Sequence, residues 1–265
     1  MKEIDLKECH KILLALGRKF HSICVENEIP YYMLGGTMLG AIRHKGFIPW
    51  DDDMDFGIPR PYFDKFVAVC SGCDMGYYKL YTRKDSFMVT NDVLKLADTR
   101  TVVEEVFKGK IKDDSIGVNI DIFPLDLNTG DKSKYSINWK IEKALKIKGY
   151  VILDESNRPL LKKIAARVMK SLLSVGMLDN YINKLMKQEA KRESLTFYAN
   201  YYGAWGMKET ISRKIFGTPT LYVFEDARFY GAEYSDAYLK SLYNNYMNLP
   251  PENKRHIHLE GCYWK

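Results

Sequence analysis

Four aspartates crowd one short stretch of the sequence, Asp51-Asp52-Asp53-Met54-Asp55. We expect this stretch to form a strand, in which alternate side chains share a face. Asp53 and Asp55 then point the same way, with Asp51 in the same parity, whereas Asp52 points to the opposite side. Carboxylates that share a face repel one another unless a cation lies between them, and Mg²⁺ prefers oxygen ligands. The stretch therefore predicts a site for Mg²⁺ or Mn²⁺.

Apolar residues frame these aspartates, with Trp50 before them and Phe56 after them. Acidic strands also occur on ordinary surfaces, but carboxylates inside an apolar frame favour a functional site. A second acidic strand, GVNIDIFPLD, carries Asp121 between two isoleucines. A lone carboxylate in such a strand needs a partner, and a cation shared with the first strand would supply it. We predict that Asp53, Asp55 and Asp121 are the catalytic and metal-binding residues.

Paired glycines precede the acidic stretch. Gly35-Gly36-Thr37 follows the apolar strand YYML and opens a short helix. Glycines in this position let backbone N–H groups approach a phosphate closely. Arg43, His44 and Lys45 follow in one loop and offer three further phosphate contacts, although a solvated basic loop is the alternative. The predicted phosphate-binding residues are Gly35, Gly36, Thr37, Arg43, His44 and Lys45.

The elements that must position these residues alternate between helix and strand as far as residue 127, which favours an α/β or α+β fold. Apolar spacing predicts helices from Ile4 to Glu28 and from Pro61 to Cys70, and strands over 77–81 and 92–98. We expect Pro124 to close the strand of Asp121, and Ser235 to act as the N-cap of a later helix. Residues 131–209 read as a basic helical insertion between a catalytic core, 1–130, and a C-terminal segment, 210–265, that completes the catalytic domain.

Positive charge is concentrated in this insertion. The chain of 265 residues has a net charge of +6, and residues 131–193 hold 15 Lys and Arg against 7 Asp and Glu. A basic block suits a nucleic acid, a phosphate-rich substrate, an anionic membrane face or simply a solvated helix surface. In particular, the amphipathic stretch from Pro159 to Gly176 fits an interfacial helix on anionic lipid, with packing on the core as the favoured alternative.

The five cysteines are odd in number and lack the spacing of a disulfide framework, which indicates reduced thiols in a cytoplasm. The single C-x-x-C, Cys70 and Cys73, is weak evidence for zinc because a structural site needs four ligands. The first residues lack the apolar core of a signal peptide, and no apolar run is long enough to span a membrane. We therefore expect a cytoplasmic protein that touches membranes peripherally at most.

The string LGGTMLGAIRHKGFIPWDDDMDFGIPRPYFDKF resembles the signature of the LicD family, within the nucleotidyltransferase superfamily that shares a DNA polymerase β-like core. Further similar stretches are VLKLADTRT, GVNIDIFPLD and the terminal YSDAYLKSLYNNYMNLPPENKRHIH. The resemblance covers about residues 4–127 and 210–258. It departs from the family at Tyr243-Asn244-Asn245-Tyr246-Met247, where the usual pattern has Gly and Asp. It implies an α+β fold, with a nucleotidyltransferase-like mixed sheet, flanking helices and a helical insertion or subdomain.

By this resemblance the protein transfers a phospho-substituent such as phosphocholine from a CDP-linked donor to a glycan or lipid-linked saccharide, releasing CMP. Asp53, Asp55 and Asp121 would hold the metal, and no nucleic acid is expected as partner. The alternatives are a nucleotidyltransferase that releases pyrophosphate from an NTP and, less favoured, an inactive binding module. Six further residues are expected to contact substrate: Trp50, Asp51, Lys95, Arg255, His256 and His258.

Overall fold

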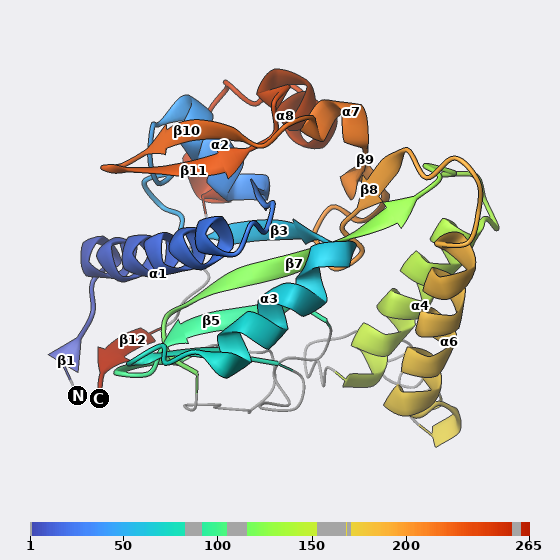
Figure 1. Ribbon diagram of the computed structural model, residues 1–265, viewed down its shortest axis with the longest axis horizontal. Coiled ribbons are helices and arrows are strands. Elements are labelled where there is room, and N and C mark those ends of the chain that lie inside the picture. The colour runs from blue at the N-terminus through green and yellow to red at the C-terminus, as the bar shows by residue number, and fades with distance from the viewer. Residues whose placement is uncertain (1, 83–91, 105–115, 153–167, 169–170, 256–260) are drawn as a thin grey trace.

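The main sheet brings the two acidic strands together. The computed structural model describes residues 2–82, 92–104, 116–152, 168, 171–255 and 261–265. Its largest sheet has the order β2 (Tyr32–Met33), β3 (Asp55–Pro59), β7 (Asn119–Asn128), β5 (Leu94–Asp98) and β4 (Tyr78–Tyr81). β3 and β7 are parallel, and the other neighbours on this path are antiparallel. Helices and mixed sheets together confirm the predicted α+β class (Figure 1).

β7 is the longest strand and continues beyond the other strands of the core. Its last residues pair with β8 (Phe197–Ala199), which pairs in turn with β9 (Thr210–Ser212). The prediction that Pro124 closes this strand is wrong. The Asp121 N–H donates to the Met54 carbonyl beside β3, so alternation turns the Pro124 nitrogen toward β5. Pairing with β5 already stops at Ile122, and the proline therefore costs no ladder hydrogen bond.

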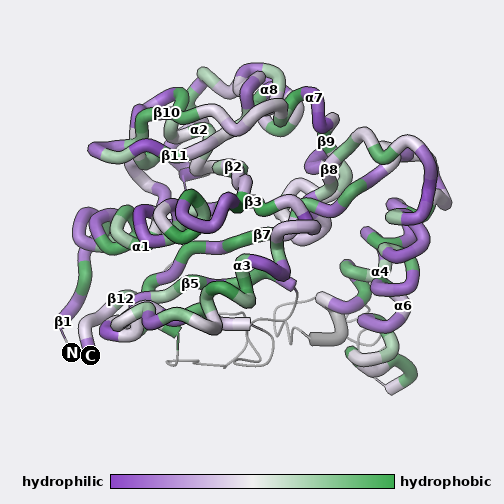
Figure 2. Tube along the Cα trace, in the orientation of Figure 1, coloured by the Kyte–Doolittle hydropathy of each residue, from purple (hydrophilic) through white to green (hydrophobic). Residues whose placement is uncertain are grey.

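Two helices pack against this sheet. α1 (Leu6–Glu26) begins where the Asp5 side chain accepts a hydrogen bond from the Glu8 N–H, at 2.8 Å, and α3 (Arg60–Gly72) follows β3 directly. Phe20 of α1 is fully buried, and its ring contacts the rings of Tyr31, Phe56 and Phe66. Figure 2 shows hydrophobic residues gathered along β3 and β7, where this core lies.

Segments that are far apart in the sequence pack together around α2. α2 (Gly35–Arg43) lies beside the hairpin of β10 (Thr220–Phe224) and β11 (Ala227–Gly231) and beside α8 (Ser235–Tyr243), as Figure 1 shows. The short helix α7 (Arg213–Phe216) packs on α8. Ser235 is the first residue of α8 and not its N-cap; Tyr234 holds that position and makes no side-chain capping bond.

A small sheet that the sequence did not reveal joins the two ends of the chain. β1 (Lys2–Glu3) and β6 (Thr101–Glu104) flank β12 (Gly261–Trp264), and both pairings are antiparallel. The two termini lie close together in Figure 1. β1 has only two residues, too few to show a strand pattern in sequence, and its pairing with β12 joins segments from opposite ends of the chain.

The helical pair α4 (Ile137–Ile152) and α6 (Val175–Glu189) stands at one end of the molecule (Figure 1). It has its own apolar cluster, Ile141, Ala144, Ile182 and Leu185. A buried amide pair, Asn128 and Asn138, ties α4 to the end of β7 at 2.6 Å. Among the described residues, no helix combines the length and the apolar character needed to cross a bilayer.

The proposed interfacial stretch from Pro159 to Gly176 lies largely outside the described residues, including Leu161 and Ile164. Four of its apolar side chains are described: Val168 is 51% exposed and Leu172 is 70% exposed, whereas Leu173 and Val175 are half-buried. Val168 and Leu172 do not pack on the core. Peripheral membrane contact stays a prediction.

The position of Phe20 gives a direct test of the core. We expect Phe20→Ala to lower the free energy of unfolding by roughly 3–5 kcal/mol, because it leaves a cavity between three aromatic rings. Val25→Ala on the same helix is the control: Val25 is 49% exposed, and this change should stay within about 0.5 kcal/mol. Urea denaturation followed by circular dichroism measures both. Equal effects of the two substitutions would contradict this packing.

Candidate metal and phosphate site

The pairing register of β3 and β7 brings two acidic residues of the site together. Asp55, the first residue of β3, lies directly opposite Asp121 of the parallel strand β7. The Asp55 backbone is held on both sides, because its N–H donates to Thr37 Oγ1 at 2.7 Å and its carbonyl accepts from the Leu34 N–H at 2.9 Å. The turn into α2 therefore fixes the start of β3, and the sheet brings together two of the three predicted metal ligands.

Asp51, Asp52 and Asp53 lie outside β3, so the prediction that they form part of the strand is wrong. The Asp51 N–H closes a turn on the Ile48 carbonyl, and the Asp51 carbonyl is 2.6 Å from Nε2 of His10 on α1. These bonds keep the segment from extending the ladder. The three carboxylates instead form a cluster in which oxygens lie within 4.8 Å of one another, with Asp52 buried and the other two half-buried.

Negative charge is concentrated around Asp55. Burial, and then the charges of Asp53 and Asp121, raise the pKa of Asp55 well above its usual value. Lys95 of β5 is one local counter-charge: its Nζ lies 2.7 Å from Asp121 Oδ1 and 3.1 Å from Asn119 Oδ1. These crowded, partly buried carboxylate oxygens fit a hard divalent cation, which would relieve their repulsion. Whether Asp53, Asp55 and Asp121 bind Mg²⁺ or Mn²⁺ stays a prediction.

The paired glycines lie against these carboxylates. Gly35 has φ +47°, and its N–H donates to the Tyr238 hydroxyl at 3.1 Å. A Cβ at Gly36 would lie 2.8 Å from Asp51 Oδ2, so any side chain there would displace the Asp51 carboxylate. Thr37 is buried, and its hydroxyl accepts from Asp55 as described above. The glycine turn thus shapes the acidic site, and its contact with a donor phosphate stays a prediction.

The basic residues Arg43, His44 and Lys45, at the end of α2 and just after it, differ in their contacts. Arg43 is half-buried; its Nη1 donates to the Tyr246 carbonyl at 2.7 Å and its Nε to His44 Nε2 at 2.9 Å. Burial lowers the pKa of Arg43, and burial together with the Arg43 charge lowers the pKa of His44. Arg43 therefore anchors the segment after α8. Lys45 has an exposed side chain, and its contact with a phosphate stays a prediction.

The predicted substrate contacts are only partly described. The guanidinium of Arg255 lies over the Trp50 ring, 4.5 Å from its centroid, and its Nε donates to the Pro250 carbonyl at 3.1 Å. The C-terminal loop therefore reaches the segment just before the aspartates. His256 and His258 lie outside the described residues.

Three residues beside the site were missed from the sequence: Glu209, Tyr238 and Tyr243. Burial and the nearby charge of Asp55 raise the pKa of Tyr243, and burial raises those of Tyr238 and Glu209. Tyr243 opens the stretch that departs from the family pattern, which was a usable signal. Glu209 ends the 3₁₀ turn η1 (Gly206–Glu209) and stands alone in its sequence context.

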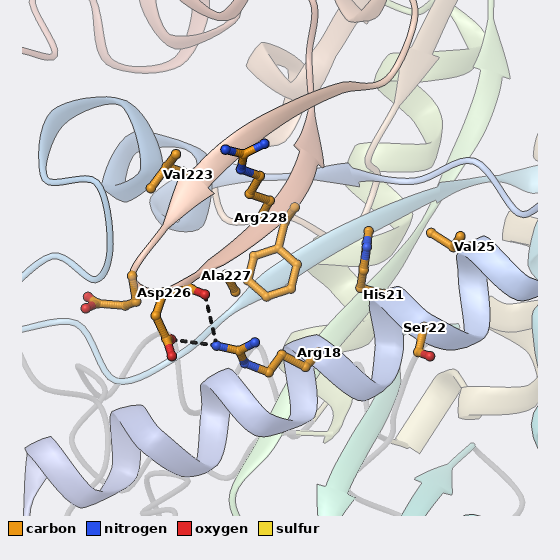
Figure 3. Close-up of a pocket in the computed structure, with 10 residues that line it drawn as sticks. Arg18, His21, Ser22, Val25, Val223, Asp226, Ala227 and Arg228 are labelled. Atoms are coloured by element: carbon orange, nitrogen blue, oxygen red, sulfur yellow. Dashed lines mark hydrogen bonds and ion pairs between the residues drawn. The ribbon is translucent and has the colours of Figure 1, made fainter.

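A separate hollow of about 760 Å³ lies between α1 and the β10–β11 hairpin (Figure 3), and none of the predicted site residues lines it. Arg18 points across it to Asp226, 2.6 Å away. His21 also lines it, and burial lowers the pKa of this histidine. None of the carboxylates of the acidic site lines this hollow.

Known proteins resemble this chain over different ranges of its sequence. Residues 28–144 match the family model described as LicD/FKTN/FKRP, nucleotidyltransferase domain, a range that contains Gly35, Asp55 and Asp121. Over 99% of both chains, the protein is 27% identical to the lipopolysaccharide cholinephosphotransferase LicD of Haemophilus influenzae. It is also 29% identical to an uncharacterized protein of Rickettsia prowazekii, over 31% of this chain and 38% of that one. A 46-residue match to an uncharacterized Rickettsia typhi protein is 48% identical and covers 17% of this chain and 15% of that one.

The crowded carboxylates predict an unusual response to substitution. We expect Asp55→Asn to raise the Tm of the metal-free protein by a few degrees, since relief of about 1 kcal/mol corresponds to roughly 2–4 °C. The same change should abolish the stabilisation that Mg²⁺ gives the wild type. Differential scanning fluorimetry in EDTA and in Mg²⁺ measures both, with the exposed Asp64→Asn of α3 as control. An unchanged Mg²⁺ response in Asp55→Asn would remove this residue from the cation site.

The close approach of Gly36 gives a second test. Gly36→Ala forces the Asp51 carboxylate to move, because a Cβ there would lie 2.8 Å from its oxygen. We expect at least a tenfold loss of activity, about 1.4 kcal/mol, with a folded protein. Gly72→Ala at the end of α3 is the matched control, because its Cβ would meet nothing within 4 Å. Full activity in Gly36→Ala would show that the position of Asp51 is unimportant.

Proposed function

We propose that this protein, an enzyme that transfers a phosphate-containing group, moves phosphocholine from CDP-choline to a hydroxyl of a cell-surface glycan. Its residues 28–144 match the LicD/FKTN/FKRP nucleotidyltransferase domain model. The observation that carries this proposal is the meeting of Asp55 and Asp121 in one register beside the glycine turn. The similarity to a lipopolysaccharide cholinephosphotransferase over the whole chain supports phosphocholine as the cargo and a lipopolysaccharide-like glycan as the acceptor.

The proposed reaction is a displacement at phosphorus. The acceptor oxygen forms a bond to the phosphorus that carries choline, and the bond from that phosphorus to the CMP oxygen breaks. Asp121, whose Oδ1 lies 2.7 Å from the Lys95 ammonium, would take the acceptor proton. Asp53, Asp55 and Asp121 would hold a divalent cation, which supplies charge neutralisation at the phosphate oxygens when bound. Lys45 would contact the diphosphate.

Transfer of a nucleotide is the second candidate, since the matched domain is described as a nucleotidyltransferase domain. It would attack the α-phosphorus of an NTP and release pyrophosphate. The crowding of carboxylates serves either reaction, because both displace an oxygen at phosphorus. The name of the full-length relative favours transfer of phosphocholine.

The leaving group separates the two candidates. We expect the purified protein, with Mg²⁺, CDP-choline and lipopolysaccharide as acceptor, to release CMP and to leave choline on the glycan. Chromatography of nucleotides and labelled choline on the acceptor measure both, and Asp121→Asn serves as the inactive control. Pyrophosphate released from CTP in the presence of the acceptor, with no CMP from CDP-choline, would reverse the assignment.

A further inference from the structure

A half-buried carboxylate lies next to the acidic site and takes no part in the phosphate chemistry described above. Glu209 Oε1 accepts from the Trp205 N–H at 2.8 Å, and Oε2 accepts from Asn200 Nδ2 at 2.7 Å. The backbone at Gly203 lies so close that any side chain there would collide with this carboxylate. Both described partners of Glu209 are neutral donors. Its charge is therefore held in a fixed position without a described cation beside it.

Two aromatic rings connect this carboxylate to the phosphate site. Trp205 and Tyr243 stand almost perpendicular, at 86°, with ring centroids 5.3 Å apart. The Tyr243 hydroxyl and Asp55 Oδ2 lie 3.6 and 3.5 Å from one point, the position that a Cβ on Gly35 would take. Tyr243 therefore borders the acidic site, and Trp205 packs against the Tyr243 ring. Trp205 is 46% exposed, so a ligand can reach it from solvent.

The indole already attracts a cation. The ammonium of Lys208 lies over the Trp205 ring, 5.7 Å from its centroid. Lys208 is exposed, and a flexible four-carbon stem lets this ammonium move aside when another cation arrives. The position of Lys208 is independent of the Glu209 contacts, and both point to positive charge at this place.

We infer that Trp205, Tyr243 and Glu209 form a subsite for the trimethylammonium group of the transferred phosphocholine, an inference that rests on the proposed function. A quaternary ammonium has charge but no N–H, so ring faces and nearby negative charge hold it. Glu209 meets this need, since its oxygens are already engaged by Trp205 and Asn200 and it supplies charge without a new hydrogen bond. The subsite lies beside Asp55, so the phosphate next to the choline reaches the carboxylates.

The test compares two donors of one shape. CDP-choline is compared with its carbon isostere, CDP-3,3-dimethylbutanol, in which a neutral carbon replaces the quaternary nitrogen. We expect kcat/KM of the wild type to favour CDP-choline by about tenfold or more, as a desolvated cation–π contact predicts. The ratio should fall close to one in Glu209→Gln and in Trp205→Leu. Glu142→Gln is the matched control, because this carboxylate also lies near η1 but pairs with Lys146.

The outcomes separate the subsite from the proposed function. Equal kcat/KM for the two donors in the wild type, or an unchanged ratio in both variants, overturns the subsite and leaves phosphocholine transfer standing. If neither donor yields CMP, the proposed function itself is contradicted. Dissociation constants of the two donors, measured by calorimetry on the wild-type chain, decide the subsite even where a variant does not fold or no acceptor is used. Equal constants overturn it.

Discussion

The fold holds several carboxylates close together against their mutual repulsion. Asp55 starts a buried strand directly opposite Asp121, and the carboxylates of Asp51, Asp52 and Asp53 crowd together just before it. Burial makes the mutual repulsion of like charges stronger, since less water is present to screen them. The backbone bonds of Asp55 to Leu34 and Thr37 keep these groups from moving apart. A folded chain that holds carboxylates in this way favours binding of a cation, which is the physical basis of the proposed chemistry.

The rest of the molecule positions this crowded set. α1 fixes the Asp51 carbonyl through His10, and β5 supplies Lys95 to Asp121. α8 returns from the far end of the sequence to offer the Tyr238 hydroxyl to Gly35. Because Arg43 binds the Tyr246 carbonyl, the segment after α8 is anchored to the end of α2. The site is therefore assembled from four separate parts of the chain, and a substitution in any of them can disturb the carboxylates.

The sequence could predict what is local. The alternation of apolar and acidic residues indicated the strands of Asp55 and Asp121, and the glycine turn before a helix was visible as a pattern. It could not show that His10 and a turn at Ile48 end the extended conformation before Asp55, because His10 is 41 residues from Asp51. Pro124 was misjudged for a similar reason: whether a proline ends a strand depends on which neighbour its nitrogen faces.

Contacts over long sequence separations explain the other omissions. Tyr238 meets Gly35 across 203 residues, and Glu209 reaches the site through a turn with no distinctive pattern. The pairing of β1 with β12 joins opposite ends of the chain through only two residue pairs. Aromatic residues were too frequent in the sequence, with 19 Tyr and 4 Trp, for any single ring to be selected. In the structure Tyr243 lies beside Asp55, and Trp205 packs against the Tyr243 ring.

The central claim is that the carboxylates of β3 and β7 bind a divalent cation, and anomalous diffraction tests it most directly. Crystals of the wild-type protein would be soaked in Mn²⁺, and an anomalous difference map would be computed from data collected near the manganese edge. The account predicts a peak in contact with oxygens of both Asp55 and Asp121, and no such peak in crystals of Asp55→Asn. A wild-type map whose peaks all lie away from these two carboxylates would contradict it.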